Sequence, residues 1–406
     1  MKVKKQKTKI LIDNSITGGR GMAKQGYEFV EELKRRKIDY LLCTDEGFAY
    51  KLRDIGVEPD IIVPTAINEP PEKVNQAFAK ALEYVEFEGL IKIGARMSGP
   101  QVAYKRKRPY VLIDAALPDV MDSGFDTFYP KDVFIGAKQY LVTTQFPWQF
   151  PNRFPELRNA RVVTYPFSEK TKTELNKLRL SPDKDIKKQV AKFVPEVNTA
   201  RYYMSIMLVI TGSYIGSIED RCTYGGWLTS AQYDQVVGFC RRFITDLGEQ
   251  APGRIIIYMD KEVLVAVSDL KEKYKSKLTL CTSRSKKWNY QEEFFLQRWA
   301  DILVSRAANY QPFMAYLERG GIITTPVPSD GYMDEDQAAI QSSDLGLSRL
   351  VTYNDEEYIK KLLNFSSDKL AQAQVSQNLK ATQKTMFRNK DCIDIALKSL
   401  GDWQAM

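Results

Sequence analysis

The sequence has 406 residues, 44% of them hydrophobic and 27% charged, with a formal net charge of +8 at pH 7. This length is too great for one ordinary core and predicts two domains of roughly 200 residues each. Because histidine is absent, the usual general base, the Ser-His and Cys-His nucleophile systems and nearly every zinc site are excluded.

In the first half, short apolar runs alternate with stretches whose apolar residues recur at helical spacing. The expected strands are residues 9–13, 40–44, 60–64, 90–94 and 110–114, and the longer helices are residues 22–36 and 72–84. This alternation predicts a parallel, doubly wound sheet. In such a sheet ligands bind beyond the carboxyl ends of the strands, so the residues that follow each strand are the candidates for a site.

A glycine-containing loop and two carboxylates stand at strand ends in this half. The loop, residues 14–21, connects the first strand to a helix, and backbone NH groups at such a helix start can hold a phosphate or an oxyanion. Asp13 and Asp114 each end a strand. A carboxylate there can act as a general base if burial raises its pKa, or it can simply cap the strand end.

The second half continues the alternation after a polar, lysine-rich stretch. Strands are expected at residues 204–210, 254–259, 277–281, 302–304 and 322–325, and helices at residues 230–247, 263–274 and 311–319. Residues 302–325 form a β-α-β unit in which Gly320 and Gly321 release the chain from the helix. Asp336 and Gln337 then fall at the start of another helix, where a carboxylate suits the helix dipole.

Four motifs of the sequence match those of a known family. Residues 17–20 read Thr-Gly-Gly-Arg, residues 94–100 read Gly-Ala-Arg-Met-Ser-Gly-Pro, residues 300–306 read Ala-Asp-Ile-Leu-Val-Ser-Arg, and residues 334–337 read Asp-Glu-Asp-Gln. In these motifs the sequence resembles the GT-B glycosyltransferases, in particular the group of lipid II-forming N-acetylglucosaminyltransferases and glycolipid transferases. That group carries T-G-G-H, G-G-Y-x-S-G-P, A-D-(I/V)-V-x-R and D-x-Q at the corresponding places.

The resemblance implies an α/β fold with two Rossmann-like parallel-sheet domains and a cleft between them. An acceptor-side domain would cover residues 1–167, followed by a linker and peripheral helix at residues 168–200. A nucleotide-sugar-binding domain would cover residues 201–385. A helix at residues 386–406 would then cross back to the first domain.

The resemblance also implies which residues bind the substrates. The donor contacts would be Gly212, Ser213 and Gly216 with the diphosphate, Arg306 with a phosphate, Asn289, Tyr290 and Gln291 with the base, and Asp336 and Gln337 with the sugar. The acceptor and phosphate loops would hold Gly18, Gly19, Arg20, Ser98 and Gly99. The ordinary alternative is a turn for Gly18 and Gly19, a salt bridge for Arg306, and helix capping for Asp336 and Gln337.

Two residues depart from the family pattern. Arg20 stands where the family has a histidine, and arginine stays protonated and cannot serve as a base. Met314 stands where the family has the glutamate that binds the ribose, so Glu318, one helical turn later, is the candidate to replace it. The base candidates are therefore Asp114 and Asp13, both at strand ends.

Composition bears on location and partners. Five scattered cysteines, none in a C-x-x-C pair, are typical of reduced thiols. With no uncharged apolar run of about 18 residues and no cleaved signal peptide, we expect a cytoplasmic protein. The positive charge is typical either of solvated lysines or of a surface that attracts a membrane or DNA.

The function implied by the resemblance is transfer of a sugar from a nucleotide-sugar, UDP-linked, to a hydroxyl of an anionic acceptor. The acceptor is either a lipid at a membrane surface or a modified base of DNA. The transfer is expected to invert the anomeric centre and to need neither a metal nor another cofactor. The alternatives are a nucleotide-sugar epimerase or hydrolase of the same fold and a degenerate GT-B subunit that only binds. The oligomeric state is left open.

Overall fold

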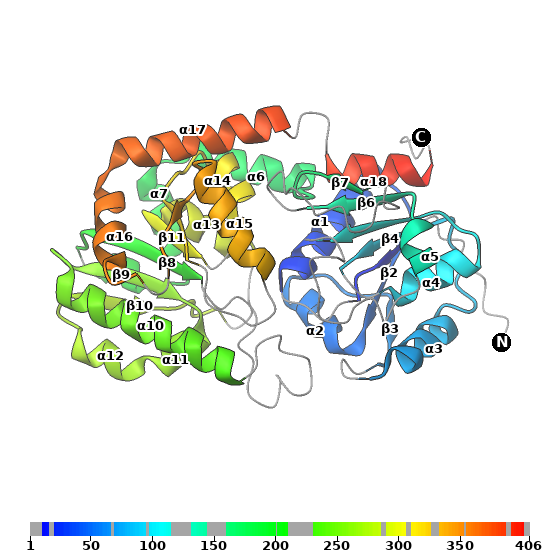
Figure 1. The fold of residues 1–406 in the computed structure, drawn as a ribbon, viewed down its shortest axis with the longest axis horizontal. Helices are drawn as coiled ribbons and strands as arrows, with labels where there is room; N and C mark the ends of the chain where they lie inside the picture. Colours follow the sequence, from blue (N-terminus) through cyan, green and yellow to red (C-terminus); the bar gives the residue numbers. More distant parts are fainter. Residues whose placement is uncertain are drawn as a thin grey trace. The chain divides into compact units, whose positions relative to one another are not determined.

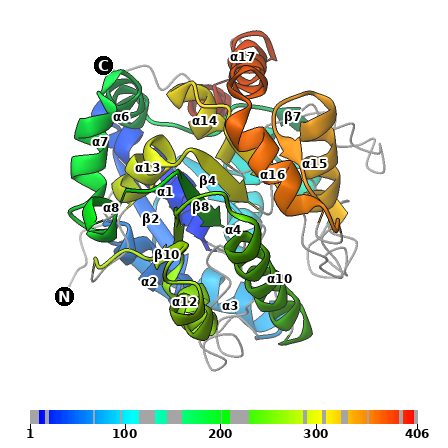
Figure 2. The same cartoon turned by 90° about the vertical axis from the view of Figure 1, so that its left-hand side faces the viewer.

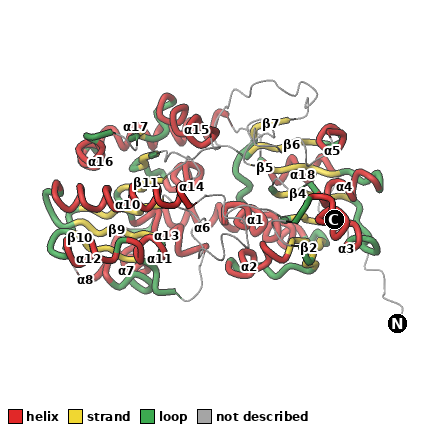
Figure 3. Tube along the Cα trace, turned by 60° about the horizontal axis from the view of Figure 1, so that its bottom comes forward, coloured by secondary structure: helices red, strands yellow, loops and turns green. Residues whose placement is uncertain are grey.

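The computed structural model describes thirteen stretches of the chain and divides them into two units (Figure 1). The first unit holds the described residues up to Thr171 together with residues 391–401, and the second holds those from Lys172 to Met386. In each unit the strands lie between helices (Figure 3). The described stretches are residues 10–15, 20–65, 69–94, 97–114, 131–143, 160–199, 201–209, 230–285, 290–305, 310–325, 333–352, 355–386 and 391–401.

The first unit is built on a seven-stranded sheet with the order β3-β2-β1-β4-β5-β6-β7, in which every neighbouring pair is parallel. Its strands are β1 (Ile10–Asp13), β2 (Tyr40–Asp45), β3 (Ile61–Val63), β4 (Gly89–Ile93), β5 (Tyr110–Asp114), β6 (Gln139–Val142) and β7 (Ala160–Val162). Its helices are α1 (Arg20–Arg36), α2 (Glu46–Asp54), α3 (Pro71–Ala81), α4 (Ser98–Lys105), α5 (Lys131–Ile135) and α18 (Cys392–Leu400). Strand order reverses at β1, since β2 lies on one side of it and β4 on the other.

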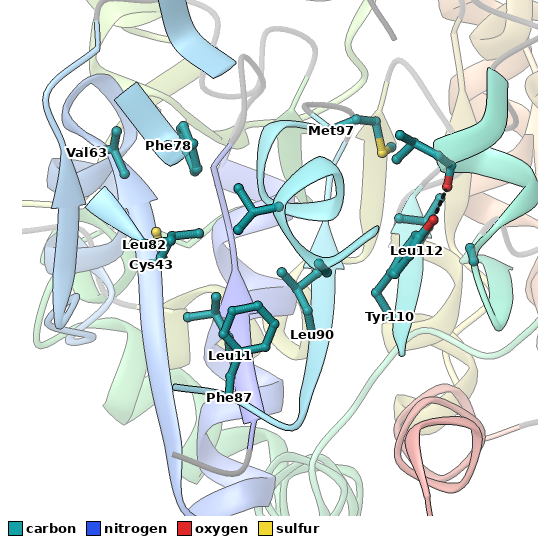
Figure 4. Close-up of a cluster of buried hydrophobic side chains, with 14 of the residues drawn as sticks. Leu11, Cys43, Val63, Phe78, Leu82, Phe87, Leu90, Met97, Tyr110 and Leu112 are labelled. Carbon is teal, nitrogen blue, oxygen red and sulfur yellow. Dashed lines mark hydrogen bonds between the residues drawn. The ribbon is translucent and has the colours of Figure 1, made fainter. Parts of the chain in front are cut away.

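One face of this sheet forms a hydrophobic core with α3 and α4. Leu11, Leu90 and Leu112 come from three neighbouring strands and pack with Phe78 and Met97 (Figure 4). The three leucines share one face of the sheet, because they belong to a single core cluster. Side chains alternate along a strand. The residues two positions further along these strands must point the same way.

Helix α18 completes the first unit from a distant part of the sequence. It packs against β4, β5 and β6 with its apolar face buried. The contact is close, because a Cβ on Gly89 would lie 3.3 Å from the side chain of Leu400. Asp394 of α18 also pairs with Arg36 of α1, and the Cys392 amide donates to Thr164 Oγ1 over 3.3 Å.

The second unit is built on a six-stranded parallel sheet with the order β10-β9-β8-β11-β12-β13. Its strands are β8 (Met204–Val209), β9 (Ile255–Met259), β10 (Leu278–Cys281), β11 (Ile302–Ser305), β12 (Ile322–Thr324) and β13 (Arg349–Leu350). Its helices are α6 (Glu169–Leu180, from Lys172 on), α7 (Asp183–Val190), α8 (Glu196–Thr199), α10 (Ser230–Gln250), α11 (Lys261–Ala266), α12 (Ser268–Lys273), α13 (Tyr290–Trp299), α14 (Gln311–Leu317), α15 (Met333–Asp344), α16 (Tyr358–Ser367) and α17 (Lys369–Met386). The predicted fold class, two Rossmann-like parallel sheets flanked by helices, is confirmed.

The β-α-β unit predicted around residues 302–325 is present as β11, α14 and β12. Two glycines allow its close packing. A Cβ on Gly320 would meet the carbonyl oxygen of Gln372 in α17 at 1.8 Å, and one on Gly321 would meet the carbonyl oxygen of Asp301 at 2.1 Å. Helix α14 therefore lies directly against α17, as Figure 2 shows.

Carboxylates of α1 hold the first turn of α6 within the first unit. Glu28 Oε2 accepts hydrogen bonds from the amide and hydroxyl of Ser168, at 2.9 and 2.6 Å. Glu32 accepts from the amide of Glu169 at 3.1 Å and from the guanidinium groups of Arg35 and Arg36. Burial alone would raise the pKa of Glu32, but these hydrogen bonds outweigh it and lower the pKa to about 2.

The low pKa of Glu32 predicts a specific pH dependence of stability. Because the folded-state pKa lies below the unfolded value near 4.5, the contribution of Glu32 is present above about pH 4.5 and is lost as the pH falls toward 2. Glu32→Gln should lower the free energy of unfolding at pH 7 by about 1–3 kcal/mol and should flatten its decline below pH 4.5. Urea denaturation at a series of pH values measures both effects. The control Glu58→Gln, in an exposed pair with Arg53, should change neither, and equal behaviour of the two variants would refute the prediction.

Candidate functional site

Three ionisable side chains stand at the carboxyl ends of three neighbouring strands in the first sheet. Asp13 ends β1, Asp114 ends β5, and Lys92 lies on β4 between them, directly opposite Asp13 in the strand register. Each follows by two positions a leucine of the core in Figure 4, so all three lie on the face covered by α3 and α4. The edge of the sheet expected to bind ligands thus carries two carboxylates and one ammonium group.

Asp13 and Lys92 form a fully buried ion pair. Both side chains are 0% exposed, and Lys92 Nζ lies 3.1 Å from Asp13 Oδ1. The same carboxylate oxygen accepts from the amide of Ser15 at 2.9 Å and from its hydroxyl at 2.5 Å. Asp13 Oδ2, in contrast, has no hydrogen-bond partner among the described residues. This arrangement holds Asp13 in place and leaves no solvent access to it.

Asp114 is less enclosed than Asp13, with 6% of its surface exposed. Its carbonyl oxygen accepts from the amide and hydroxyl of Thr143, at 2.8 and 3.1 Å, and Gln25 of α1 donates to that hydroxyl over 3.1 Å. The main chain at the end of β5 is therefore fixed by β6 and α1. Asp114 thus lies at the carboxyl end of β5, the strand end expected from the sequence.

Ser98 and Gly99, expected in an acceptor loop, form the first turn of α4. The buried hydroxyl of Ser98 donates to Asn75 Oδ1 over 2.7 Å and so ties α4 to α3. A Cβ on Gly99 would lie 2.0 Å from Asp13 Oδ2. Glycine at this position lets the helix start come close to the buried carboxylate, where the positive end of the helix dipole favours a negative charge.

Gly99→Ala is expected to destabilise the protein by about 1–3 kcal/mol or more. The added methyl group would overlap Asp13 Oδ2, and Asp13 cannot move aside cheaply because Lys92 and Ser15 hold it. The free energy of unfolding in urea measures the effect. Gly21→Ala in α1 is the matched control, since nothing lies within 4 Å of its Cβ position. If both substitutions cost the same, the contact with Asp13 is not the cause.

In the second unit a buried polar cluster holds α15 against the sheet. Gln311 of α14 donates from Nε2 to Ser342 Oγ of α15. Ser342 Oγ lies 2.6 Å from Ser348 Oγ, which in turn lies 3.1 Å from Thr324 Oγ1 at the end of β12. Helix α15 carries Asp336 and Gln337, whose side chains lie outside the described part of the structure. The cluster therefore fixes the helix on which both residues stand.

The start of α13 also lies at the carboxyl edge of the second sheet, because the helix follows β10. The ring of Tyr290 is buried, 4.7 Å from the ring of Phe294, and Gln291 Nε2 donates to Glu174 Oε1 over 3.2 Å. One turn further, Glu293 is buried beside Tyr310, and burial together with the charge of Glu293 raises the pKa of that phenol. The sequence motifs did not indicate this acid and phenol pair.

Glu318 lies at the amino edge of the second sheet, opposite the carboxyl edge. It follows α14 with a left-handed backbone conformation (φ 53°), just before the chain enters β12 at the amino end of that strand. Its carboxylate pairs with Lys380 at 2.8 Å and with Arg179, and the hydrogen bond from Lys380 lowers its pKa. Residue 314 is a buried methionine. Because donor sites lie at carboxyl edges, we do not retain Glu318 among the donor-binding residues.

The remaining predicted site residues lie wholly or in part outside the described residues. Those that lie wholly outside the described residues are Gly18, Gly19, Gly212, Ser213, Gly216, Asn289 and Arg306. Arg20 is the first residue of α1, and its side chain also lies outside the described part. Within the described ranges, no group of three or more acidic or cysteine side chains is arranged to hold a metal ion. No helix among the described residues is long and apolar enough to cross a membrane.

At the carboxyl edge of the first sheet, Lys92 is the residue that the sequence motifs did not indicate. A signal was present, because a lysine interrupts the apolar run Gly-Leu-Ile-Lys-Ile of residues 89–93. A charged residue inside a buried strand requires a partner. Its partner lies on β1, 79 residues earlier, and only the strand order shows that the two strands are neighbours.

No protein-family model matches the sequence, and no curated protein matches it either. Solved structures match it over nearly its whole length. MurG from Acinetobacter baumannii aligns with a TM-score of 0.57 and 14% identity, covering 96% of this chain and 99% of that one. A glycosyltransferase from Rickettsia africae ESF-5 aligns with a TM-score of 0.61 and 12% identity, covering 97% and 98%.

An enzyme of another kind is similar to the same degree. The UDP-GlcNAc 2-epimerase from Neisseria meningitidis, bound to UDP-GlcNAc, aligns with a TM-score of 0.59 and 12% identity, covering 97% of this chain and 99% of that one. At such identities the similarity establishes the fold and nothing further. The motifs predicted this fold correctly, and the chain has the GT-B glycosyltransferase-like fold.

Proposed function

We propose that the protein is a glycosyltransferase that moves a sugar from a UDP-sugar to an acceptor hydroxyl. The observation that carries the proposal is the fold, which is shared over 96–97% of the chain with MurG and other glycosyltransferases. A similar structure, HepE of Anabaena, was solved with UDP and glucose, and this supports a uridine nucleotide as the carrier. The motifs at residues 300–306 and 334–337 favour the same reading.

The donor is proposed to bind at the carboxyl edge of the second sheet. Support comes from the buried polar cluster that holds α15 there, since this helix carries Asp336 and Gln337. A carboxylate beside a carboxamide can bind neighbouring sugar hydroxyls in two directions. The other proposed donor contacts are Gly212, Ser213 and Gly216 with the diphosphate, Arg306 with a phosphate, and Asn289, Tyr290 and Gln291 with the base.

Asp114 is the proposed general base. It would accept the proton of the acceptor hydroxyl while that oxygen bonds to the anomeric carbon of the sugar. The bond from that carbon to the diphosphate breaks at the same time, and its electron pair leaves with UDP. A single displacement of this kind inverts the anomeric centre. Backbone NH groups and Arg306 would balance the charge on the departing diphosphate, so that no metal is required. Asp13 is less suited, because it is fully buried and paired with Lys92.

The acceptor is proposed to carry phosphate. The net charge of +8 supports this, because a basic surface attracts polyanions. A membrane lipid and a modified base of DNA both satisfy the condition. An electrophoretic shift assay with duplex DNA at several salt concentrations distinguishes them, since binding to DNA weakens steeply with salt. Absence of any shift at low salt would leave the lipid.

A thermal-shift panel of nucleoside diphosphates and nucleotide-sugars tests the donor. UDP and at least one UDP-sugar should raise the Tm, because a ligand at about 100 times its Kd stabilises the native state by about 2.7 kcal/mol. Uridine without phosphates is the control and should have little effect. Mass spectrometry of lipids and DNA incubated with the best donor then detects the product. A panel in which no nucleoside diphosphate raises the Tm would contradict the proposal.

A nucleotide-sugar epimerase or hydrolase is the second candidate, because the UDP-GlcNAc 2-epimerase of Neisseria meningitidis has the same fold. Such an enzyme converts its donor without any acceptor, whereas a transferase is nearly inert until an acceptor is added. Incubation of the donor with the protein alone therefore separates the two. A degenerate subunit that only binds, suggested by Arg20 and Met314, would show a thermal shift but no product.

A further inference from the structure

Burial of the ion pair of Asp13 and Lys92 costs free energy of folding. Removing two charges from water costs several kcal/mol per ion before any interaction is regained, and well-packed apolar residues stabilise such positions as well or better. The neighbouring strand residues on this face are the apolar Leu11, Leu90, Leu112 and Cys43. Stability alone therefore does not account for charged residues here, and the contacts of the pair show what else they do.

Most contacts of the pair converge on Ser15, the residue by which the chain leaves β1. Lys92 Nζ donates to the Ser15 carbonyl oxygen and to Ser15 Oγ, the latter at 2.9 Å. Asp13 Oδ1 accepts from the amide and the hydroxyl of the same residue. All polar groups of Ser15 are thus bound to the pair. An ammonium group suits this task because it offers three donors from one point.

The residue before Ser15 is held by the rest of the sheet. The Asn14 amide donates to the Cys43 carbonyl over 2.9 Å, and its own carbonyl accepts from Thr44 Oγ1 at 3.0 Å. A Cβ on Gly26 of α1 would lie 2.0 Å from Asn14 Oδ1, so α1 closes over this side chain. The backbone from Asp13 to Ser15 is therefore held in one conformation. Backbone pairing with β2 fixes Asn14, and Lys92 fixes Ser15.

We propose that Lys92 is a positioning residue for the reaction of the first unit. It sets the path of the chain at the carboxyl end of β1, the strand at which the order of the sheet reverses and beside which ligands of such sheets bind. Asp114 stands on the same face two strands away. A fixed main chain there keeps the acceptor in register with the base, and small misplacements of reacting groups cost large factors in rate. This inference rests on the proposed function.

The test compares Lys92→Met with Leu90→Ala. Both alter buried residues on the same face of β4, and both are expected to destabilise the protein. Only the first removes the contacts of the ammonium group to the carbonyl oxygen and hydroxyl of Ser15. Hydrogen exchange at the Ser15 amide should accelerate by about tenfold or more in Lys92→Met relative to Leu90→Ala, when both are compared at equal global stability. With a UDP-sugar and acceptor, kcat should fall by about 10²-fold, while KM for the donor stays close to that of the wild type.

The double variant Asp13→Leu, Lys92→Met is the control for the case in which Lys92→Met alone does not fold. Because it leaves no uncompensated charge, it should fold and show the same low kcat. Exchange at Ser15 is judged in Lys92→Met alone, because the double variant also removes Asp13 Oδ1, the acceptor of the Ser15 amide. The inference is overturned if Lys92→Met matches Leu90→Ala in exchange at Ser15, or if Lys92→Met and the double variant both match Leu90→Ala in kcat. The exchange measurement needs no turnover. If the wild type transfers no sugar, the proposed function fails, and the exchange still decides whether Lys92 holds Ser15.

Discussion

Replacing Asp114 with asparagine is expected to lower kcat for sugar transfer by about 10²–10⁴-fold, the range that a general base contributes. The substitution keeps the shape of the side chain but removes its ability to accept a proton. The main chain at Asp114 is held through its carbonyl oxygen by Thr143, so the protein should remain folded. KM for the donor should change little, because the donor is proposed to bind to the second unit. Initial rates with a UDP-sugar and acceptor measure both constants.

Asp45→Asn provides the control for Asp114→Asn. Asp45 is a buried carboxylate at the end of β2, on the far side of β1 and β4 from β5. It matches Asp114 in residue type and in its place at a strand end, and it has no proposed part in the reaction. Its substitution should leave kcat close to the wild-type value. If Asp114→Asn is as active as this control, Asp114 is not the base.

Asp13→Leu is expected to lower the free energy of unfolding by about 3–5 kcal/mol, because it leaves the charge of Lys92 buried without its partner. The double variant Asp13→Leu, Lys92→Met should recover most of this loss, since two apolar side chains can fill the same space without a desolvation cost. Urea denaturation of the wild type, both single variants and the double variant gives the coupling energy between the two sites.

The exposed pair of Arg53 and Glu58 is the reference for that cycle. It has a short contact of 2.7 Å, yet both side chains are about half exposed or more, so its removal should change stability little. A double variant at Asp13 and Lys92 that is no more stable than the single variants would show that the pair itself, and not the loss of one partner, stabilises the fold.

Much of the fold could be predicted because its strands are short apolar runs bounded by polar turns. The run expected at residues 110–114 is strand β5, and the described residues 10–13 of the run expected at residues 9–13 are strand β1. The edge strand β13 has only two residues, Arg349 and Leu350. This is too short to show an alternation of apolar and polar residues in the sequence. The lysine-rich stretch at residues 168–200 folds largely as helices α6, α7 and α8. Few of the exposed residues of these helices are apolar.

The candidate site was less predictable, because it depends on which strands become neighbours. Asp114 was identified from its place at a strand end, which is a local property. The pairing of Asp13 with Lys92 is not local, since it requires β1 to lie beside β4. Glu318 shows the opposite case. It lies one helical turn from residue 314 in sequence, but that turn carries it toward the amino edge of the sheet, away from the expected ligand.

The placement of α18 has a consequence for biosynthesis. The surface of β4, β5 and β6 that this helix covers stays open while the nascent chain emerges, because residues 392–400 leave the ribosome long after residues 89–142. Residues 172–386 are complete by then and can fold first. The first unit must therefore wait until residues 392–400 have been made, with an apolar surface that chaperones can recognise in the meantime.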